Sequence, residues 1–187
     1  MKLKLSKRRR DCPDRASEAG GPSAPSYMQW ILSQVSSVGW AIPGVPGDGA
    51  AAPWAYSIGL WASYGHPDIA VFGRSLGQLA VISKTLCQRV AEEDALSPGD
   101  EIDDVCPSRL AIRDVHESWR TTPLFQASDQ FHGYIRPPML QVAWADRDGH
   151  FPWEQRFEPA LADAQPMLWL HIDDHPPGPW TRLTALG

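Results

Sequence analysis

A serine with a glycine two residues to either side is the first feature of this sequence that could do chemistry. Residues 73–77 (GRSLG) match G-x-S-x-G, a pattern that places a nucleophilic serine on a sharp turn between a strand and a helix. Such a serine attacks an acyl carbon after a histidine takes its proton, and His150 and His171 follow in the required chain order. Ser75 with Gln78 also forms the pair that begins many helices. The motif therefore leaves open whether Ser75 is a nucleophile or a helix cap.

A histidine in a short connection is the second candidate. His66 lies in residues 65–68 (GHPD), between two expected strands, where a histidine can act as acid, base or ligand contact. Asp146 lies in another polar turn further along the chain. The two could be the acid and base of a small hydrolase if both reach one substrate. His66 is equally an ordinary turn residue, so this pairing is a hypothesis that geometry must test.

Two groups of polar residues resemble metal sites but do not complete one. His171, Asp173 and His175 would share one face of an extended strand, yet outward polar residues are what any half-buried strand shows. Residues 146–149 (DRDG) resemble part of a calcium loop, but tryptophan and glutamine occupy the two positions that need carboxylates. We therefore expect no metal and no cofactor.

Charge is divided unevenly along the chain. Residues 1–10 (MKLKLSKRRR) hold six of the 17 basic side chains and no acidic one, so the net charge of -5 becomes -11 over residues 11–187. A short run of like charge usually stays solvated, and the following Ser-, Ala-, Gly- and Pro-rich stretch resembles a linker. We predict a disordered basic tail and linker over residues 1–26. The acidic remainder makes nucleic-acid binding unlikely to extend beyond weak contacts of residues 1–10.

Composition favours a soluble protein of the cytoplasm. No stretch reaches the roughly 18 apolar residues that a membrane span needs, and no apolar segment follows the basic run as in a secretory signal. Cys12, Cys87 and Cys106 are odd in number and widely spaced, which is typical of free thiols in a reducing compartment. We expect a cytoplasmic location and no membrane association.

Hydrophobic periodicity, caps and turn residues predict the elements that would position these side chains. Helices are expected over residues 27–38, 75–93 and 122–133, and strands over residues 54–60, 68–72, 109–115, 139–145, 151–153 and 167–172. The DRDG turn would join two of these strands in a hairpin. The expected fold is α+β, a single domain over residues 27–175 with a mixed, mostly antiparallel sheet flanked by two or three helices. Residues 176–187 are expected to form an irregular proline-rich tail.

Five ordered blocks carry a family resemblance. They are residues 55–60 (AYSIGL), 65–73 (GHPDIAVFG), 140–146 (LQVAWAD), 149–154 (GHFPWE) and 165–168 (QPML). Together they resemble the bacterial domain-of-unknown-function family numbered 4262, over roughly residues 28–169. The resemblance implies a self-contained cytoplasmic domain and brings no established activity, cofactor or catalytic residue. The chain departs from the family pattern at Asp68, usually glutamate, at Ala145, usually proline, and at Arg74 and Ser75, where the pattern tends to leucine and proline.

Polar and aromatic residues gathered in two short segments suggest the function. We expect a module that binds a small molecule or a protein partner, with its pocket between the connection that follows residue 56 and the hairpin of residues 141–153. The candidate ligand-binding residues are Tyr56, His66, Gln141, Trp144, Asp146 and Trp153. The alternative is a small hydrolase that uses His66 with Asp146, or Ser75. The sequence contains no complete catalytic set, so the catalytic residues stay open.

Overall fold

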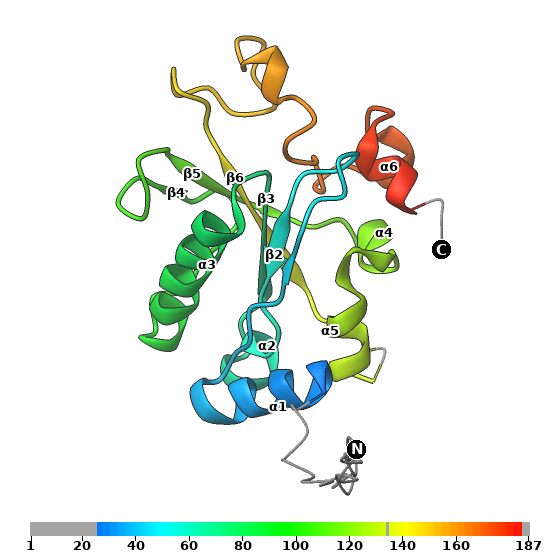
Figure 1. Ribbon diagram of the computed structural model, residues 1–187. Coiled ribbons are helices and arrows are strands. Elements are labelled where there is room, and N and C mark those ends of the chain that lie inside the picture. The colour runs from blue at the N-terminus through cyan, green and yellow to red at the C-terminus, as the bar shows by residue number, and fades with distance from the viewer. Residues whose placement is uncertain (1–25, 134, 185–187) are drawn as a thin grey trace, which may run out of the picture.

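A six-stranded sheet forms the centre of the structure, a computed structural model that describes residues 26–133 and 135–184 (Figure 1). The strands are β1 (Gly44–Val45), β2 (Trp54–Tyr56), β3 (Asp68–Phe72), β4 (Glu101–Ile102), β5 (Leu110–Asp114) and β6 (Met139–Trp144). Their order across the sheet is β1-β2-β3-β6-β5-β4. β3 and β6 run parallel, and every other neighbouring pair is antiparallel. The sheet is therefore mixed and mostly antiparallel, and the predicted α+β class is confirmed.

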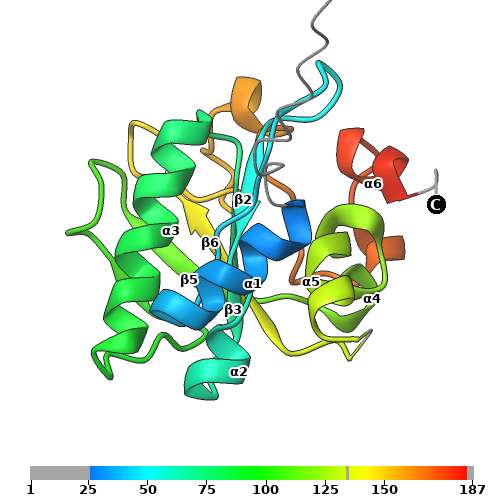
Figure 2. The same ribbon diagram turned by 60° about the horizontal axis from the view of Figure 1, so that its bottom comes forward.

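Helices cover both faces of the sheet (Figure 2). The helices are α1 (Tyr27–Val38), α2 (Leu60–Tyr64), α3 (Leu76–Ala91), α4 (Glu117–Arg120), α5 (Gln126–Phe131) and α6 (Pro179–Thr184), with short 3-10 turns at Pro123–Phe125, Pro159–Leu161 and Ile172–Asp174. α3 packs on one face, while α1, α4, α5 and α6 contribute to the core on the other. β3 shows the two-sided burial directly, because Ile69 and Val71 face the α3 side and Ala70 and Phe72 face the opposite side. The six described helices exceed the two or three expected, because the shortest ones carry no periodic pattern of their own.

Local signals fixed the two long helices correctly. Ser26 and Ser75 each accept a hydrogen bond from the backbone three residues on, and Gln29 and Gln78 complete the two capping boxes. Gly39 ends α1 with φ 91°, a conformation that suits glycine. The predicted helices over residues 27–38 and 75–93 are therefore confirmed, the second ending at Ala91.

The first predicted strand is shorter than expected, because its last residue belongs to a helix. β2 ends at Tyr56, and the chain turns at Gly59, where φ is 111°. Leu60 then begins α2, and its backbone N–H donates to the carboxylate of Asp68 at 3.1 Å. A bond to Asp68 at the start of β3 thus overrides the alternating pattern.

Two further strands predicted near the C-terminus are absent from the described structure, over residues 151–153 and 167–172. After β6 the Asp-Gly turn does form, with Gly149 at φ 89° and a bond from its N–H to the Asp146 carbonyl oxygen. The chain then loops instead of pairing as a hairpin. The second segment is held by side-chain bonds from Gln141 and ends in a 3-10 turn, so the shared strand face expected for His171 and its neighbours does not exist.

The described residues near the C-terminus contain more regular structure than expected. Residues 176–187 were expected to be an irregular tail outside the domain, but their described part contains α6. Trp180 is buried, and its ring packs edge-on against Trp54 and Phe72 of the core. α6 is therefore part of the single domain, because burying a tryptophan contributes strongly to core stability.

One expectation concerns a part of the chain that the structure leaves undescribed, and another concerns the described helices. The disordered tail and linker predicted over residues 1–26 fall outside the described residues up to residue 25. Among the described helices, none combines the length and apolar character that a membrane crossing requires.

Candidate functional site

The connection that holds His66 and the turn that holds Asp146 lie at opposite edges of the sheet. β3 and β6 run parallel with Asp68 paired to Met139, so His66 lies before both strands and Asp146 lies after them. β6 alone has 6 residues. At about 3.3 Å per residue these span close to 20 Å, far beyond hydrogen-bond reach. The two residues cannot act as one acid–base pair, and their segments do not share a pocket.

His66 serves as a link between two backbone segments. Its Nδ1 lies 2.7 Å from the carbonyl oxygen of Pro67, and its Nε2 accepts a hydrogen bond of 3.0 Å from the backbone N–H of Leu96. Nε2 also lies 3.1 Å from the carbonyl oxygen of Leu96. Because the carbonyl oxygen of Pro67 can only accept, Nδ1 carries a proton and donates it to Pro67. Both ring nitrogens are therefore engaged with the backbone, and this histidine ties the start of β3 to the segment after α3.

Asp146 organises the turn after β6. Its Oδ1 accepts hydrogen bonds from the backbone N–H groups of Asp148 and His150, at 3.0 and 2.8 Å, and its Oδ2 accepts from Glu158 at 2.9 Å. Burial alone would raise the pKa of Asp146, but these bonds outweigh it and lower the pKa below its ordinary value. The carboxylate is thus an ionised structural acceptor within the loop.

Three other predicted residues pack inside the fold. Tyr56 meets Phe125 edge-on at 5.4 Å between ring centroids, and burial raises the pKa of its hydroxyl well above the ordinary value. Trp153 stacks on Phe151, and the Arg113 guanidinium lies over the Trp153 ring. Gln141 is fully buried and bonds to a neighbouring backbone segment. None of the three lines the pocket described next.

Trp144 is the predicted residue that leads to a pocket. Its indole N–H donates to the carbonyl oxygen of Phe72 at 2.7 Å, which fixes the ring beneath the turn that follows β3. The guanidinium of Arg74 lies over this ring, 3.8 Å from the centroid. The turn is the GRSLG motif, so the site lies at the segment where a nucleophile was considered.

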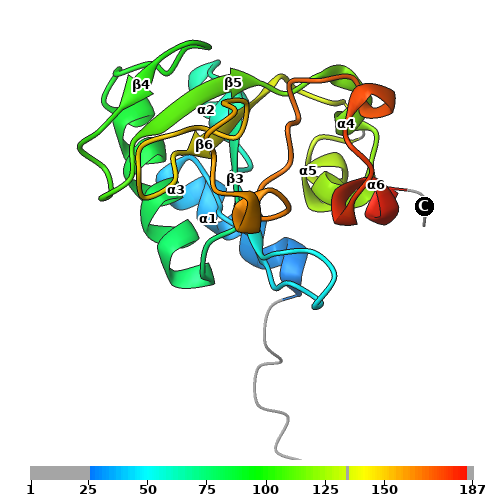
Figure 3. The same cartoon turned by 90° about the horizontal axis from the view of Figure 1, so that it is seen from above.

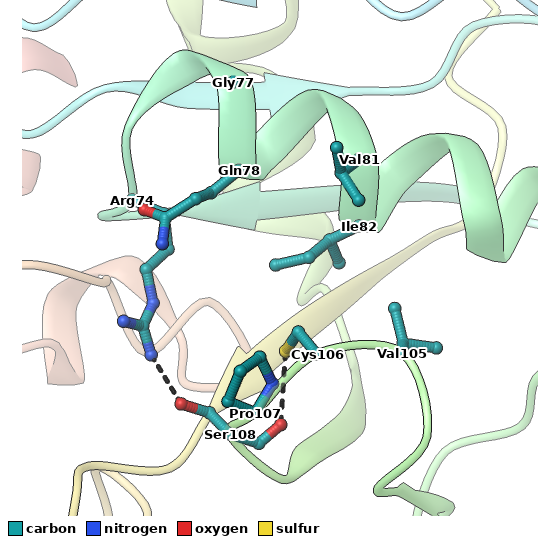
Figure 4. Close-up of a pocket in the computed structure, with 9 residues that line it drawn as sticks. All are labelled: Arg74, Gly77, Gln78, Val81, Ile82, Val105, Cys106, Pro107 and Ser108. Atoms are coloured by element: carbon teal, nitrogen blue, oxygen red, sulfur yellow. Dashed lines mark hydrogen bonds between the residues drawn. The ribbon is translucent and has the colours of Figure 1, made fainter.

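The pocket opens between the first turns of α3 and the loop before β5 (Figure 4). It has a volume of about 420 Å³ and is lined mainly by apolar or small residues. The lining consists of Arg74, Gly77, Gln78, Val81, Ile82, Val105, Cys106, Pro107 and Ser108. Figure 4 shows the Arg74 side chain reaching across from the α3 side to Ser108 on the loop. A single cation in a largely apolar pocket is the main chemical feature of this site.

Arg74 carries an uncompensated charge. Its Nη2 donates to the hydroxyl oxygen of Ser108 at 2.8 Å, and within the described residues no carboxylate forms an ion pair with it. Burial lowers the pKa of Arg74, but a guanidinium stays protonated in proteins. Arg74 is not among the candidate residues predicted from sequence, because a lone arginine gives no local signal of being unpaired. The sequence singles it out only as part of the GRSLG motif and as a departure from the family pattern, which tends to leucine after Gly73.

Ser75 has the geometry of a cap. Its φ of -59° and ψ of 148° are ordinary extended values, without the strained backbone of a nucleophile turn. Its hydroxyl lies 3.0 Å from Gln78 Oε1 and accepts from the Gln78 backbone N–H. The side chain is fully used in beginning α3, so the structure favours the capping explanation.

Replacing the cap gives a direct test. We expect Ser75→Ala to lower the free energy of unfolding by about 1 kcal/mol, because α3 loses its N-cap acceptor. Ser75→Asp should leave stability unchanged or slightly higher, since a carboxylate caps as well and favours a helix N-terminus. Urea denaturation followed by circular dichroism measures both. Equal stability of Ser75→Ala and the unmodified protein would contradict the capping role.

The histidines once considered for a metal site have other partners. His171 accepts a hydrogen bond from the backbone of Asp173 and begins a 3-10 turn, while His175 Nε2 accepts from the backbone N–H of Met167. Within residues 26–133 and 135–184, no group of three or more histidine, cysteine or acidic residues is placed to hold a metal ion.

Comparison with known proteins places this architecture in a family. The model of the family described as "Domain of unknown function (DUF4262)" matches residues 34–158, about two thirds of the chain. The chain belongs to this family. Comparisons with curated proteins and with solved structures give no match. The DUF4262 match includes every residue that lines the Arg74 pocket and ends before α6.

Proposed function

We propose that this DUF4262 protein is a binding module for a small organic anion, a carboxylate with an apolar body, held in the Arg74 pocket. The observation that carries the proposal is the Arg74 charge, which has no carboxylate partner among the described residues, at the edge of a largely apolar pocket. A partly desolvated guanidinium that lacks a carboxylate partner attracts an anion more strongly than an exposed one does. The ligand would provide the counter-charge that the described chain does not.

The remaining lining suits the apolar body of such a ligand. Val81 is 59 % exposed although it lines the pocket, and Val105 and Pro107 form the facing wall. The volume of about 420 Å³ lies within the range of about 300–1,000 Å³ that is usual for small-molecule sites. A ligand that covers these side chains would remove their apolar surface from water, which contributes a favourable free energy of roughly 25 cal/mol per Å² buried.

The N-terminus of α3 adds to the attraction for an anion. α3 has 16 residues, so its aligned peptide dipoles place partial positive charge at its first turn. Gly77 lines the pocket in that turn, and a side chain added there would meet no atom within 4 Å. An oxyanion can therefore approach the backbone beside Arg74 without steric hindrance.

Of the functions hypothesised from sequence, a small-molecule binding module agrees with this proposal. The pocket is formed by residues between 74 and 108 and not by the segments expected from sequence. The proposal does not include a hydrolase, because Ser75 is occupied as a cap and His66 and Asp146 lie at opposite edges of the sheet. We also propose a cytoplasmic location, which agrees with the free thiols of Cys87 and Cys106.

The experiment compares a charged probe with its neutral analogue. We expect 3-phenylpropionate and hexanoate to raise the melting temperature of the protein, and their amides to have little effect, because only the acids pair with Arg74. Calorimetric titration of Arg74→Met should show at least a tenfold loss of affinity for the acids, while Arg74→Lys retains part of it. Arg147→Met removes an exposed arginine after β6 and is the matched control.

Two outcomes would overturn the proposal. Equal binding of the amides would show that charge is not recognised. Unchanged binding of the acids by Arg74→Met would show that they bind elsewhere. Because Arg74 also stacks on Trp144, a melting curve of each ligand-free variant shows whether a loss of binding reflects a loss of folding.

A further inference from the structure

A second pocket, different in character, lies on the side of the sheet that faces away from α3. It has a volume of about 450 Å³ and is lined entirely by polar or charged residues: His116, Glu117, Ser118, Arg120, Thr121, Arg136 and His171. They come from α4 and its two capping residues, from the segment before β6, and from the cap of the 3-10 turn at Ile172–Asp174. Figure 3 shows α4 and α6 on the side of the molecule away from α3. Of these residues, only His171 is a candidate from the sequence.

The hydrogen bonds around the two histidines fix which nitrogen carries the proton. His116 Nδ1 accepts from the backbone N–H of Ser118 at 3.2 Å and lies 3.0 Å from the Ser118 hydroxyl. Because Nδ1 accepts from a backbone N–H it carries no proton, so the Ser118 hydroxyl, which accepts from the backbone N–H of Ile172, is the donor in its contact with His116. His171 Nδ1 likewise accepts from the backbone N–H of Asp173. Both neutral rings therefore carry the proton on Nε2.

Both Nε2–H groups remain available as donors. The two rings meet edge-on with centroids 5.0 Å apart, so the donors belong to one small region. Among the described residues, neither Nε2 has a hydrogen-bond partner. In this tautomer the Nδ1 lone pairs are occupied and Nε2 is protonated, which suits an anion and not a metal ion.

Two arginines add positive charge. Arg120 donates through Nη1 to the carbonyl oxygens of Arg136 and Pro137, at 2.9 and 3.3 Å, and no carboxylate in the described chain pairs with it. Arg136 is 3.6 Å from Asp129 and still lines the pocket. Glu117 is the one acidic residue of the lining, so cationic and donor groups outnumber it.

We propose that this pocket binds the phosphate group of a small phosphorylated molecule. Guanidinium groups match phosphate oxygens with paired N–H donors, and the two imidazole N–H groups, on rings whose centroids lie 5.0 Å apart, add further donors at the same pocket. The volume exceeds what a bare phosphate needs and lies in the small-molecule range, so the remaining space takes the organic part. The polar lining favours a hydroxylated body such as a sugar.

The test uses ribose 5-phosphate, inorganic phosphate and ribose, titrated by calorimetry into the full chain in a phosphate-free buffer. We expect ribose 5-phosphate to bind with saturation at millimolar concentration or below, inorganic phosphate to bind more weakly, and ribose not to bind. Tight binding of inorganic phosphate alone would overturn the organic-phosphate proposal. The absence of binding by both phosphates would overturn the site altogether.

Variants locate the binding. His116→Asn with His171→Asn keeps an acceptor at each capping position, because asparagine is a good N-cap, and removes both Nε2–H donors. Arg136→Gln removes an exposed charge. We expect each variant to weaken ribose 5-phosphate binding at least tenfold. Arg147→Gln removes one positive charge, as Arg136→Gln does, and should leave ribose 5-phosphate binding unchanged. Arg74→Met should also leave it unchanged, which separates this site from the Arg74 pocket. Unaltered binding in the histidine and Arg136 variants would overturn the proposal.

Discussion

Replacement of Gln141 by methionine is expected to lower the free energy of unfolding by roughly 2–6 kcal/mol. The Gln141 side chain is fully buried, and its Nε2 donates to the carbonyl oxygen of Pro166 at 2.6 Å while its Oε1 accepts from the N–H of Leu168 at 2.9 Å. Methionine has a similar volume but leaves both backbone groups buried without a partner. Each unsatisfied group costs about 1–3 kcal/mol. Urea denaturation followed by tryptophan fluorescence measures the change.

A matched substitution separates this effect from the change of residue type. Gln88 on α3 is exposed, and within the described part of the chain its side-chain amide bonds only to Glu92. Gln88→Met should change stability by no more than about 0.5 kcal/mol, as is usual for surface substitutions. If Gln141→Met and Gln88→Met have the same effect, the buried amide does not hold the segment at residues 166–168.

A second glutamine completes the attachment of that segment to β6. β3 pairs with β6 only as far as Val142, so the backbone of Trp144 lacks a strand partner on that side. The side chain of Gln165 provides the missing hydrogen bonds, because its Oε1 accepts from the Trp144 N–H and its Nε2 donates to the Trp144 carbonyl oxygen. The segment therefore stabilises the tryptophan on which Arg74 lies, and it does so from outside the residues that match the family.

The parts of the fold that sequence predicted well are those set by local interactions. α1 and α3 begin at capping boxes whose partners are three residues apart, so the signal is contained in a single turn. β3 was recognisable because both of its faces are buried and its sequence, DIAVF, is almost wholly apolar. In each case the residues that decide the structure are neighbours in the chain.

The region after β6 could not be predicted in the same way. Its path is set by Asp146, which binds backbone as far as Glu158, and by Gln141, which binds backbone 25 and 27 residues away. Alternating side chains in residues 167–172 were interpreted as a strand, but their burial reflects packing on other elements. α6 was missed because its stability comes from Trp180 in the core and not from helical periodicity.

In the candidate site, too, the sequence predicts what depends on neighbouring residues and does not predict what depends on contacts between distant ones. His66 and Asp146 are candidates from sequence because polar side chains in turns often bind ligands. In the structure both side chains form their hydrogen bonds with backbone groups of the chain itself. Arg74 is a candidate because no carboxylate of the described residues pairs with it. Whether an arginine has such a partner depends on the tertiary structure and cannot be read from the neighbouring sequence. Trp144 is the one candidate from sequence that contacts this arginine in the structure, because the Arg74 guanidinium lies over its ring.

Substitution of Gly73 by alanine is the second large effect, with an expected loss of roughly 2–5 kcal/mol in the free energy of unfolding. Gly73 follows β3 with φ 77°, and an added Cβ would overlap the backbone carbonyl of Ala164. The left-handed conformation costs a non-glycine residue about 1–2 kcal/mol, and forcing a methyl group against packed backbone adds about 1–3 kcal/mol. Urea denaturation gives the loss of stability.

Gly149→Ala is the matched control for Gly73→Ala, because it separates backbone strain from the collision with Ala164. Gly149 has φ 89° but only Arg109 Nη2 within 4 Å of an added Cβ, at 3.9 Å, so its replacement should cost about 1–2 kcal/mol from strain alone. Because Gly73 adjoins Arg74, movement of the turn away from Ala164 would also displace the guanidinium from Trp144 and weaken binding of 3-phenylpropionate. Equal losses of stability in the two variants would show that the segment at Ala164 yields freely and does not fix the position of the arginine.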